Sequence, residues 1–286
     1  MTSFIKQSAT AGAFAALLTL AAAVAAAAPA SPPVIKLYTL DCGLTEFKDA
    51  DVFSDTGEYE HQPLALPTPC YLIQHGKQWL LWDTGLSDRI AAAPNGAVEK
   101  FGGRFSVKRT LAAQLAQLNL QPEAIDYVGI SHLHFDHSGN IYQFPKSTFL
   151  LAAAELAAAR ARPAPFGVDA ALIAPLAKAK VATFQDDHDV FGDGSVTILK
   201  TPGHTKGHRS LLVKLPASGP LLITGDLYHT RQNYDKGLVP RINDRADTLA
   251  SMDRFMRVKA NTKARVIIQH APEDFKAMPA FPEFLQ

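Results

Sequence analysis

One short segment, His132-Leu-His134-Phe-Asp136-His137, constrains this chain more than any other feature, because it holds four potential metal ligands. It follows the apolar run of residues 125–130, which predicts a buried strand. Imidazole nitrogens and carboxylate oxygens are ligands of zinc and of neighbouring transition metals. A lone histidine is often an ordinary polar loop residue, but this density favours a metal site in a tight turn after the strand.

Three further segments each place one ligand-type side chain directly after an apolar run. They are Thr-Pro-Gly-His204-Thr-Lys-Gly-His208, Leu-Ile-Thr-Gly-Asp226 and Ile-Ile-Gln-His270. One tetrahedral zinc ion takes four ligands, so a larger set predicts two divalent metal ions that share a carboxylate, with zinc as the expected metal. The candidate ligands are His132, His134, Asp136, His137, His204, Asp226 and His270.

The composition is that of an ordinary globular protein. Of 286 residues, 47% are hydrophobic and 19% are charged, which excludes a disordered chain. Lys and Arg number 28 against 27 Asp and Glu, so no general attraction to nucleic acid or to anionic membranes is expected. Neither is therefore an expected partner, and the oligomeric state stays open between monomer and homodimer.

The first thirty residues have the pattern of a secretory signal peptide. Lys6 is followed by an uncharged Ala/Leu/Val-rich stretch over residues 11–28, which ends in small residues. A membrane anchor is the alternative, but alanine is weakly apolar and no basic cluster follows Pro33. We expect cleavage near residue 30, a single catalytic domain over 31–286, and a periplasmic or secreted protein without stable membrane insertion.

Export would place Cys42 and Cys70 in an oxidising compartment, where a disulfide persists. Each cysteine lies at the edge of an apolar run. The pattern is equally compatible with a disulfide and with two buried thiols.

Downstream, strand-like and helix-like segments alternate without an internal repeat or linker. Strands are expected at 34–40, 70–74, 79–83, 125–130, 148–151, 196–200, 210–215, 221–224 and 265–269, and helices at 110–120, 152–161 and 246–258. Residues 43–66 and 87–107 are expected to be long loops that cover a substrate. The economical interpretation is one domain of mixed sheets flanked by helices.

The ordered motifs resemble those of the metallo-β-lactamase superfamily, and Leu-Trp-Asp83-Thr-Gly85 resembles its earlier Asp-Thr-Gly turn. The resemblance implies an α+β fold, an αββα four-layer sandwich. It further implies that His132, His134 and His204 bind one metal ion, that Asp136, His137 and His270 bind the other, and that Asp226 bridges them. By the same resemblance Asp83 orients ligands without binding metal. His208 is implied to make a structural hydrogen bond.

Within the superfamily the chain is similar to the N-acyl-homoserine lactonases. The similarity lies in Val-Ile-Lys-Leu-Tyr38, Pro67-Thr-Pro-Cys-Tyr-Leu-Ile73, Asp83-Thr-Gly-Leu86 and His137-Ser-Gly-Asn140. It implies a dinuclear hydrolase that opens the lactone ring of N-acyl-homoserine lactones, a quorum-quenching activity, by attack of a metal-bridging hydroxide. The alternatives are another ester, lactone or phosphotriester hydrolase of this fold and, from a different class, a non-catalytic metal- or signal-binding protein.

The chain departs from these lactonases at one position. Many of them carry a tyrosine three residues after the bridging aspartate, where this chain has His229, with Tyr228 one residue earlier. Imidazole also donates hydrogen bonds, so His229 or Tyr228 is expected to contact the substrate carbonyl or the leaving oxygen. Asp136 and Asp226 are the expected proton carriers. A solvent-facing loop histidine is the alternative for His229.

The aromatic and aliphatic residues of the two long loops are candidates for an acyl-chain channel or for loop packing, and the sequence does not choose between these roles. They are Phe47, Val52, Phe53, Tyr59, Ile90, Phe101 and Phe105.

Overall fold

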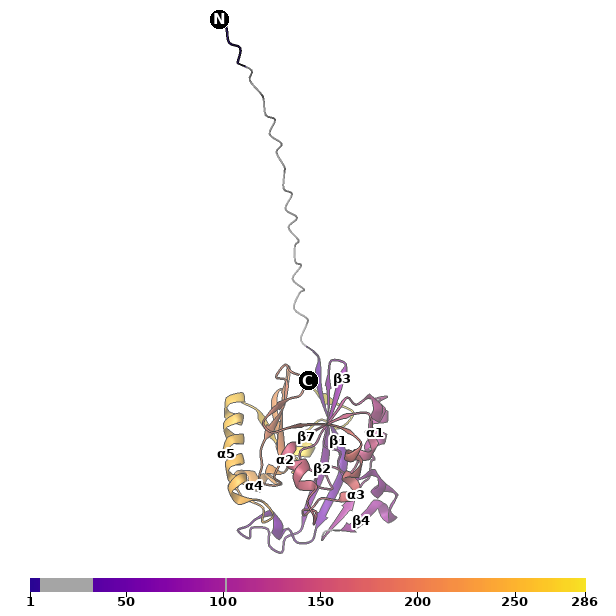
Figure 1. Ribbon diagram of the computed structural model, residues 1–286. Coiled ribbons are helices and arrows are strands. Elements are labelled where there is room, and N and C mark those ends of the chain that lie inside the picture. Colours follow the sequence, from indigo (N-terminus) through magenta and orange to yellow (C-terminus); the bar gives the residue numbers. More distant parts are fainter. Residues whose placement is uncertain (6–32, 101) are drawn as a thin grey trace. The chain divides into compact units, whose positions relative to one another are not determined.

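The computed structural model describes residues 1–5, 33–100 and 102–286 (Figure 1). The predicted signal segment falls almost wholly on residues 6–32, outside the described residues. Contacts group residues 33–286 into one compact unit. Among the described residues, no helix combines the length and the apolar character that crossing a membrane requires.

The compact unit is built on two sheets. In the larger sheet, strands that are distant in sequence pair around the central β1–β2 hairpin, and β3, β6, β7 and β8 pair in parallel. Its strands in spatial order are β4 (Ala97–Lys100), β5 (Gly103–Ser106), β1 (Ile35–Phe47), β2 (Leu64–His75), β3 (Gln78–Trp82), β6 (Tyr127–Gly129), β7 (Thr148–Ala152) and β8 (Lys180–Phe184), with β14 (Phe284–Leu285) paired to β1.

The smaller sheet is antiparallel except for the parallel pair β12–β13. This pair is joined through a helix, as parallel connections require. Its strands in spatial order are β13 (Arg265–Ile267), β12 (Gly219–Ile223), β11 (Arg209–Leu215), β10 (Val196–Lys200) and β9 (His188–Asp189).

The two sheets pack face to face because their strands alternate apolar side chains between two faces. In β2, Tyr71 and Ile73 point into the layer between the sheets, where they meet Leu211 and Val213 of β11. The intervening Leu72 points to the opposite, outer face of the larger sheet. Both faces of each sheet are therefore buried, which explains why these strands read as continuous apolar runs.

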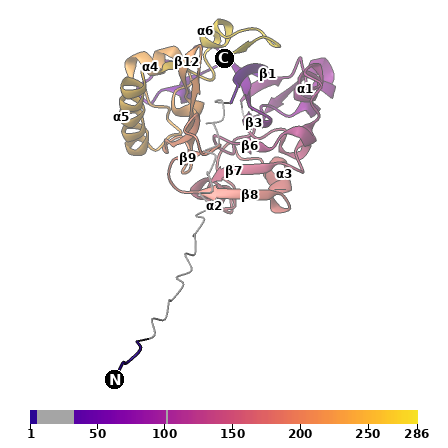
Figure 2. The same cartoon turned by 90° about the horizontal axis from the view of Figure 1, so that it is seen from above.

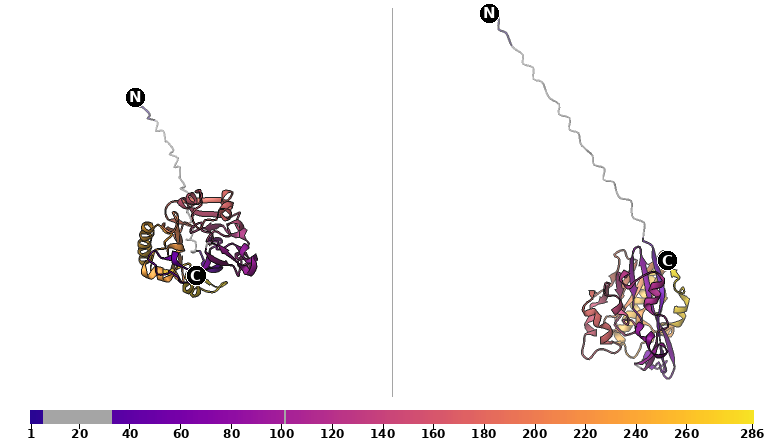
Figure 3. Two further views of the ribbon diagram at one scale, coloured as in Figure 1. Left: turned by 90° about the horizontal axis from the view of Figure 1, so that it is seen from below. Right: turned by 90° about the vertical axis from the view of Figure 1, so that its right-hand side faces the viewer.

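Helices cover the two outer faces. Leu111 and Leu115 of α1 (Leu111–Gln117) pack on the larger sheet, whereas Met252 and Phe255 of α5 (Arg245–Thr262) pack on the smaller one. Figure 2 shows α1 and α5 on opposite sides of the strands, and the further views of Figure 3 show the same layers. This arrangement confirms the predicted αββα sandwich. The remaining α-helices are α2 (Ala153–Ala159), α3 (Ala170–Ile173), α4 (Arg231–Lys236) and α6 (Pro272–Ala277).

The two segments expected to be long loops are more ordered than predicted. β1 continues to Phe47 and β2 begins at Leu64, so the first loop is shorter than expected, and the second segment contains the β4–β5 hairpin. β5 pairs with the extended end of β1, with Thr45 opposite Phe105. This pairing joins residues far apart in sequence, which a local pattern does not reveal.

Candidate metal centre

The predicted ligands converge because each one follows the end of a strand at the same edge of the sandwich. The His132–His137 turn comes after β6, and His204 comes after β10. Asp226 lies in the 3₁₀ helix Gly225–Leu227 after β12, and His270 follows β13, the parallel neighbour of β12. Four separate segments thus deliver seven side chains to one cluster.

The first group consists of His132, His134 and His204, whose ligand atoms lie within 4.8 Å of one another. His204 Nε2 lies 3.1 Å from His134 Nδ1. Asp226 Oδ2 lies 3.3 Å from His204 Nε2 and 3.7 Å from His132 Nε2. Three nitrogens and one carboxylate oxygen therefore surround a common point, as a tetrahedral ion requires.

The second group consists of Asp136, His137 and His270. The Nε2 atoms of the two histidines lie 3.1 Å apart, and Asp136 Oδ2 lies 3.8 Å from that of His137 and 3.9 Å from that of His270. Asp226 contributes its other oxygen here, because Oδ1 lies 3.1 Å from His137 Nε2 and 3.0 Å from His270 Nε2. The Asp226 carboxylate thus stands between the two groups with one oxygen toward each.

The tautomers of the histidines show that these groups fit cations. His137 Nδ1 is hydrogen-bonded to Asp83 Oδ2, and His270 Nδ1 is hydrogen-bonded to the Pro67 carbonyl. In its neutral form each ring therefore donates from Nδ1 and presents a lone pair at Nε2. His132 Nε2 is buried without any hydrogen-bond partner. Lone pairs that converge in a buried space repel one another unless a cation lies between them, so the donor set fits a pair of divalent ions.

Electrostatics favour the ligating form of the first group. Burial lowers the pKa of His134 to about 4 and holds the pKa values of His132 and His204 well below their usual range. These imidazoles are therefore neutral, which is the form that binds metal. In the second group burial acts in the same direction, but Asp226, Asp83 and Asp136 together raise the pKa of His137.

Asp83 is a buried carboxylate that orients residues of the cluster. Its oxygens accept hydrogen bonds from the Ser131 backbone N–H, the Ser131 hydroxyl, His137 Nδ1 and Gln269 Nε2, at 2.7–2.9 Å. His208 also acts behind the ligands, since its Nε2 accepts the Asp226 backbone N–H at 2.8 Å and its Nδ1 donates to the Thr201 carbonyl. Asp83 therefore orients the His137 side chain, and His208 holds the backbone of Asp226, whose carboxylate is shared by the two groups.

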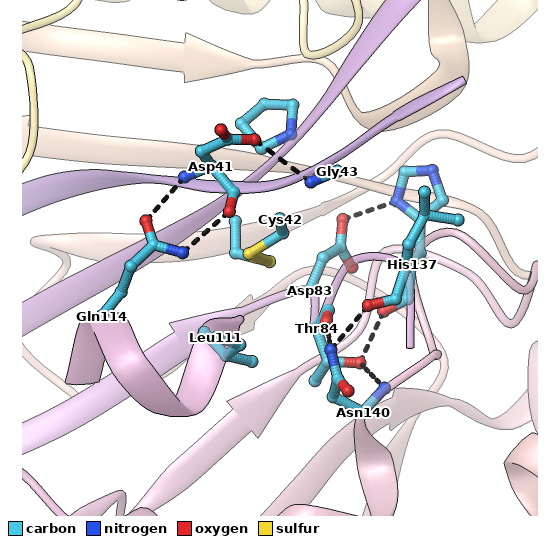
Figure 4. The surroundings of a disulfide bond; sticks show 12 residues. Asp41, Cys42, Gly43, Asp83, Thr84, Leu111, Gln114, His137 and Asn140 are labelled. Carbon is cyan, nitrogen blue, oxygen red and sulfur yellow. Dashed lines mark hydrogen bonds and ion pairs between the residues drawn. A yellow bond between two sulfur atoms is a disulfide. The ribbon is translucent and has the colours of Figure 1, made fainter. Parts of the chain in front are cut away.

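The Asp83 turn packs directly against a disulfide. Cys42 and Cys70 are joined, which resolves the alternative that their sequence left open (Figure 4). Gly85 has φ +66°, and a Cβ at this residue would lie 2.2 Å from Cys42 Cβ, so only glycine fits here. The Leu86 N–H also donates to the Cys42 carbonyl. The disulfide therefore supports the turn that positions His137.

Glu155 is a supporting residue that sequence reasoning missed. It is 2% exposed, and its carboxylate accepts the backbone N–H groups of Leu133 and Gly207 and the hydroxyl of Thr205. Leu133 lies between His132 and His134, and Thr205 follows His204. One carboxylate thus joins the two turns that supply the first group. The sequence feature that could have indicated this role is the single acidic residue in the alanine-rich segment 152–159.

We expect Glu155→Gln to weaken metal binding about 10- to 100-fold, as loss of a residue that orients ligands does. The amide would present an N–H toward either the Gly207 N–H or the Leu133 N–H, and a buried donor without a partner is costly. Metal affinity would be measured by competition with a chelator, with the exposed Glu123→Gln as the matched control. Equal affinities for the two variants would show that Glu155 does not support the cluster.

His229 lies at the cluster, but Tyr228 does not. His229 is 3% exposed, with Nε2 3.1 Å from Asp226 Oδ2 and with Nδ1 lacking a hydrogen-bond partner. Its ring meets Phe53 edge-on at 5.0 Å. Tyr228 instead packs among the rings of Tyr234 and Phe255 beneath α5. Of the two alternatives, His229 is therefore the residue that lines the metal cluster, because consecutive residues of this extended segment point to opposite sides.

A cavity of about 390 Å³ lies over the cluster and includes His134, Asp136, His204, Asp226, His229 and His270 in its wall. It is called the metal cavity below. Its apolar wall contains Phe47, Val52, Phe53, Leu66, Phe135, Phe166 and Ile242. Of the loop residues considered from sequence, Tyr59, Ile90 and Phe105 instead pack into hydrophobic clusters beneath the loops, and Phe101 lies outside the described residues.

Comparison with known proteins agrees with this geometry. Residues 64–270 match the family model of the metallo-beta-lactamase superfamily. The N-acyl homoserine lactonase AttM of Azorhizobium caulinodans is 30% identical over 267 residues, 86% of this chain and 98% of that protein. The N-acyl homoserine lactonase AiiA of Bacillus thuringiensis subsp. kurstaki is 29% identical over 231 residues, 78% of this chain and 88% of that protein.

Solved structures show the same similarity. A quorum-quenching N-acyl homoserine lactone hydrolase superposes with a TM-score of 0.77 at 26% identity, covering 89% of this chain and 100% of that one. Another N-acyl homoserine lactone hydrolase structure, with a TM-score of 0.76 at 27% identity and coverage of 88% and 99%, holds the product N-hexanoyl-L-homoserine at its catalytic metal center.

Proposed function

The chain belongs to the metallo-beta-lactamase superfamily, and from this premise we propose that it is a metal-dependent hydrolase that opens the lactone ring of N-acyl-homoserine lactones. The observation that carries the proposal is the position of Asp226, with one oxygen toward each of two ligand groups at the floor of an apolar-walled cavity. Relatives that span nearly the whole length of the domain carry the same activity in their names.

The residues that would hold the two divalent ions are His132, His134 and His204 for one, Asp136, His137 and His270 for the other, and Asp226 for both. Zinc is the metal that we propose, because imidazole and carboxylate ligands suit it. When bound, such ions supply Lewis acidity and make a water molecule acidic enough to react near neutral pH. The protein's own part is to hold the ligands, to exclude bulk water and to place the ester.

His229 provides a hydrogen-bond donor beside the reacting centre. Its side chain lines the metal cavity, with Nε2 3.1 Å from Asp226 Oδ2. An N–H at this place could donate to the substrate oxygen on which negative charge develops during ester hydrolysis. Phe53 packs against the ring and helps to hold its orientation. We propose that His229 takes the part that a phenol plays three residues after the shared aspartate in many related lactonases.

We expect His229→Phe to lower kcat about 100-fold while the protein still binds two metal ions, because loss of one donor to a developing oxyanion has an effect of this size. His229→Tyr should recover part of the rate, since it restores a donor. Turnover and metal content would be measured on the same preparations. A fall in metal content equal to the fall in rate would assign His229 to ion binding instead.

The proposed activity is tested by pH-stat titration of butyryl- and dodecanoyl-homoserine lactone with protein that holds two metal equivalents. Ring opening releases one proton per lactone, so metal-dependent acid release supports the proposal. Faster turnover of aryl esters or paraoxon-type phosphotriesters than of either lactone would overturn it in favour of another hydrolase. Two bound ions without hydrolysis of any of these substrates would indicate a binding protein.

We also propose that residues 1–30 are a signal peptide, that 31–286 are the single catalytic domain and that the protein is periplasmic or secreted. The disulfide supports this location, since disulfides persist in oxidising compartments. The charge balance is consistent with a protein that acts without nucleic acid or membrane insertion. Expression of the full chain in a bacterial host, followed by fractionation and mass measurement, tests this. An uncleaved cytoplasmic product would contradict it.

A further inference from the structure

A second cavity, of about 410 Å³, adjoins the metal cavity. It is called the second chamber below. The two cavities share His134, Phe166, His204 and Ile242 in their walls, so they meet beside the first ligand group. Beyond this junction the second chamber extends toward α2 and the segment that follows it. A molecule bound at the metal cluster would therefore lie beside the second chamber.

The interior of the second chamber is apolar. Ala158 of α2, Pro165 and Val168 contribute to its wall. The polar side chains near them are already bonded, since both carboxylate oxygens of Glu155 accept hydrogen bonds and Asn243 contacts His204 and Thr248. A ligand would find few unsatisfied polar groups inside, which favours a hydrocarbon over a polar or charged group.

The junction itself carries exposed apolar side chains. Phe166 is 60% exposed and Ile242 is 37% exposed, and both line the two cavities. Large apolar side chains beside a functional cavity mark a ligand-binding surface. Charged residues stand at the outer rim of the chamber, where Lys206 Nζ lies 3.7 Å from Asp244 Oδ2. The chamber therefore has an apolar interior and a polar edge.

We propose that the second chamber binds the distal methylenes of a long acyl chain and makes the enzyme selective for long-chain substrates. This inference rests on the proposed function, which places the lactone ring in the metal cavity. The chain would pass between Phe166 and Ile242 and end against Ala158. The alternative path for the acyl chain runs along Phe47, Val52 and Phe53 on another wall of the metal cavity.

Ala158→Phe tests the proposal by filling the chamber. Burial of one methylene changes an equilibrium constant about fourfold, so exclusion of three or four methylenes should lower kcat/KM for dodecanoyl-homoserine lactone about 50- to 200-fold. The value for butyryl-homoserine lactone should change less than about twofold. Ala157→Phe is the matched control, because Ala157 is exposed on the same helix and lines neither cavity.

A dodecanoyl-to-butyryl ratio in Ala158→Phe equal to that of the unaltered protein would overturn the proposal and place the chain along Phe47. If Ala158→Phe does not fold, Ala158→Leu reduces the chamber less and should lower the same ratio about fivefold. Calorimetric binding of ring-opened dodecanoyl-homoserine provides a readout without turnover, and Ala158→Phe should weaken it as strongly. Inactivity of the unaltered protein on both lactones would overturn the proposed function, whereas this binding assay would still decide whether the chamber holds an acyl chain.

Discussion

Replacement of Asp226 by asparagine is expected to lower kcat/KM for N-acyl-homoserine lactones by at least about 10³-fold, because several kcal/mol of transition-state stabilisation are lost. Asparagine keeps the shape of the side chain but removes the negative charge between the two ligand groups. That charge lies 3.0–3.3 Å from His137, His204 and His270. Without it the two metal ions would repel each other with less compensation.

The same substitution should lower the metal content from two equivalents toward one. Metal analysis after gel filtration and pH-stat turnover would be measured together, with Asp235→Asn as the control. Asp235 lies on an exposed position of α4, so this control makes the same chemical change away from the cluster. Full metal content with full activity in Asp226→Asn would refute the bridging role.

Removal of the disulfide is expected to lower the free energy of unfolding by about 3–4 kcal/mol, the size expected for closing a loop of this length. The bond joins residues 28 positions apart on adjacent strands of the β1–β2 hairpin. The double variant Cys42→Ala/Cys70→Ala would be compared with the unaltered protein by denaturant unfolding at equal metal concentration, since bound metal also stabilises the folded state.

The disulfide variant should also bind metal more weakly. Gly85 packs on Cys42, and this turn carries Asp83, which holds His137. A reducing agent should affect the unaltered protein and leave the double variant unchanged, which separates loss of the bond from side effects of the reagent. Unchanged unfolding midpoints in both comparisons would show that the bond contributes nothing to stability.

Sequence patterns were sufficient to predict the layers of the fold but not the strands at the two edges of the larger sheet. The runs in β2, β3, β11 and β12 are continuous and apolar because both faces of each strand are buried, and this is visible locally. The β4–β5 hairpin was missed because its identity as a strand pair depends on pairing with the extended end of β1. β8 was missed because its residues are exposed or only partly buried and show no clear alternation.

The residues that support the metal ligands were likewise predicted only where a local motif contains them. Asp83 and His208 were expected because they belong to recognisable motifs. Glu155 lies in an ordinary alanine-rich helix, and its importance comes from contacts with turns 22 and 50 residues away. No local pattern distinguishes such a buried carboxylate from a solvent-exposed helical glutamate.

The side chains that could form the metal cluster are recognisable without the fold, because each ligand occupies a short motif at the end of an apolar run. The tertiary structure alone decided that His229 and not Tyr228 reaches the cluster, that Cys42 pairs with Cys70, and that a second chamber joins the metal cavity. The physical reason is that ligand identity is local chemistry. The direction of a side chain, the distance between two cysteines and the space between elements depend on how distant segments pack.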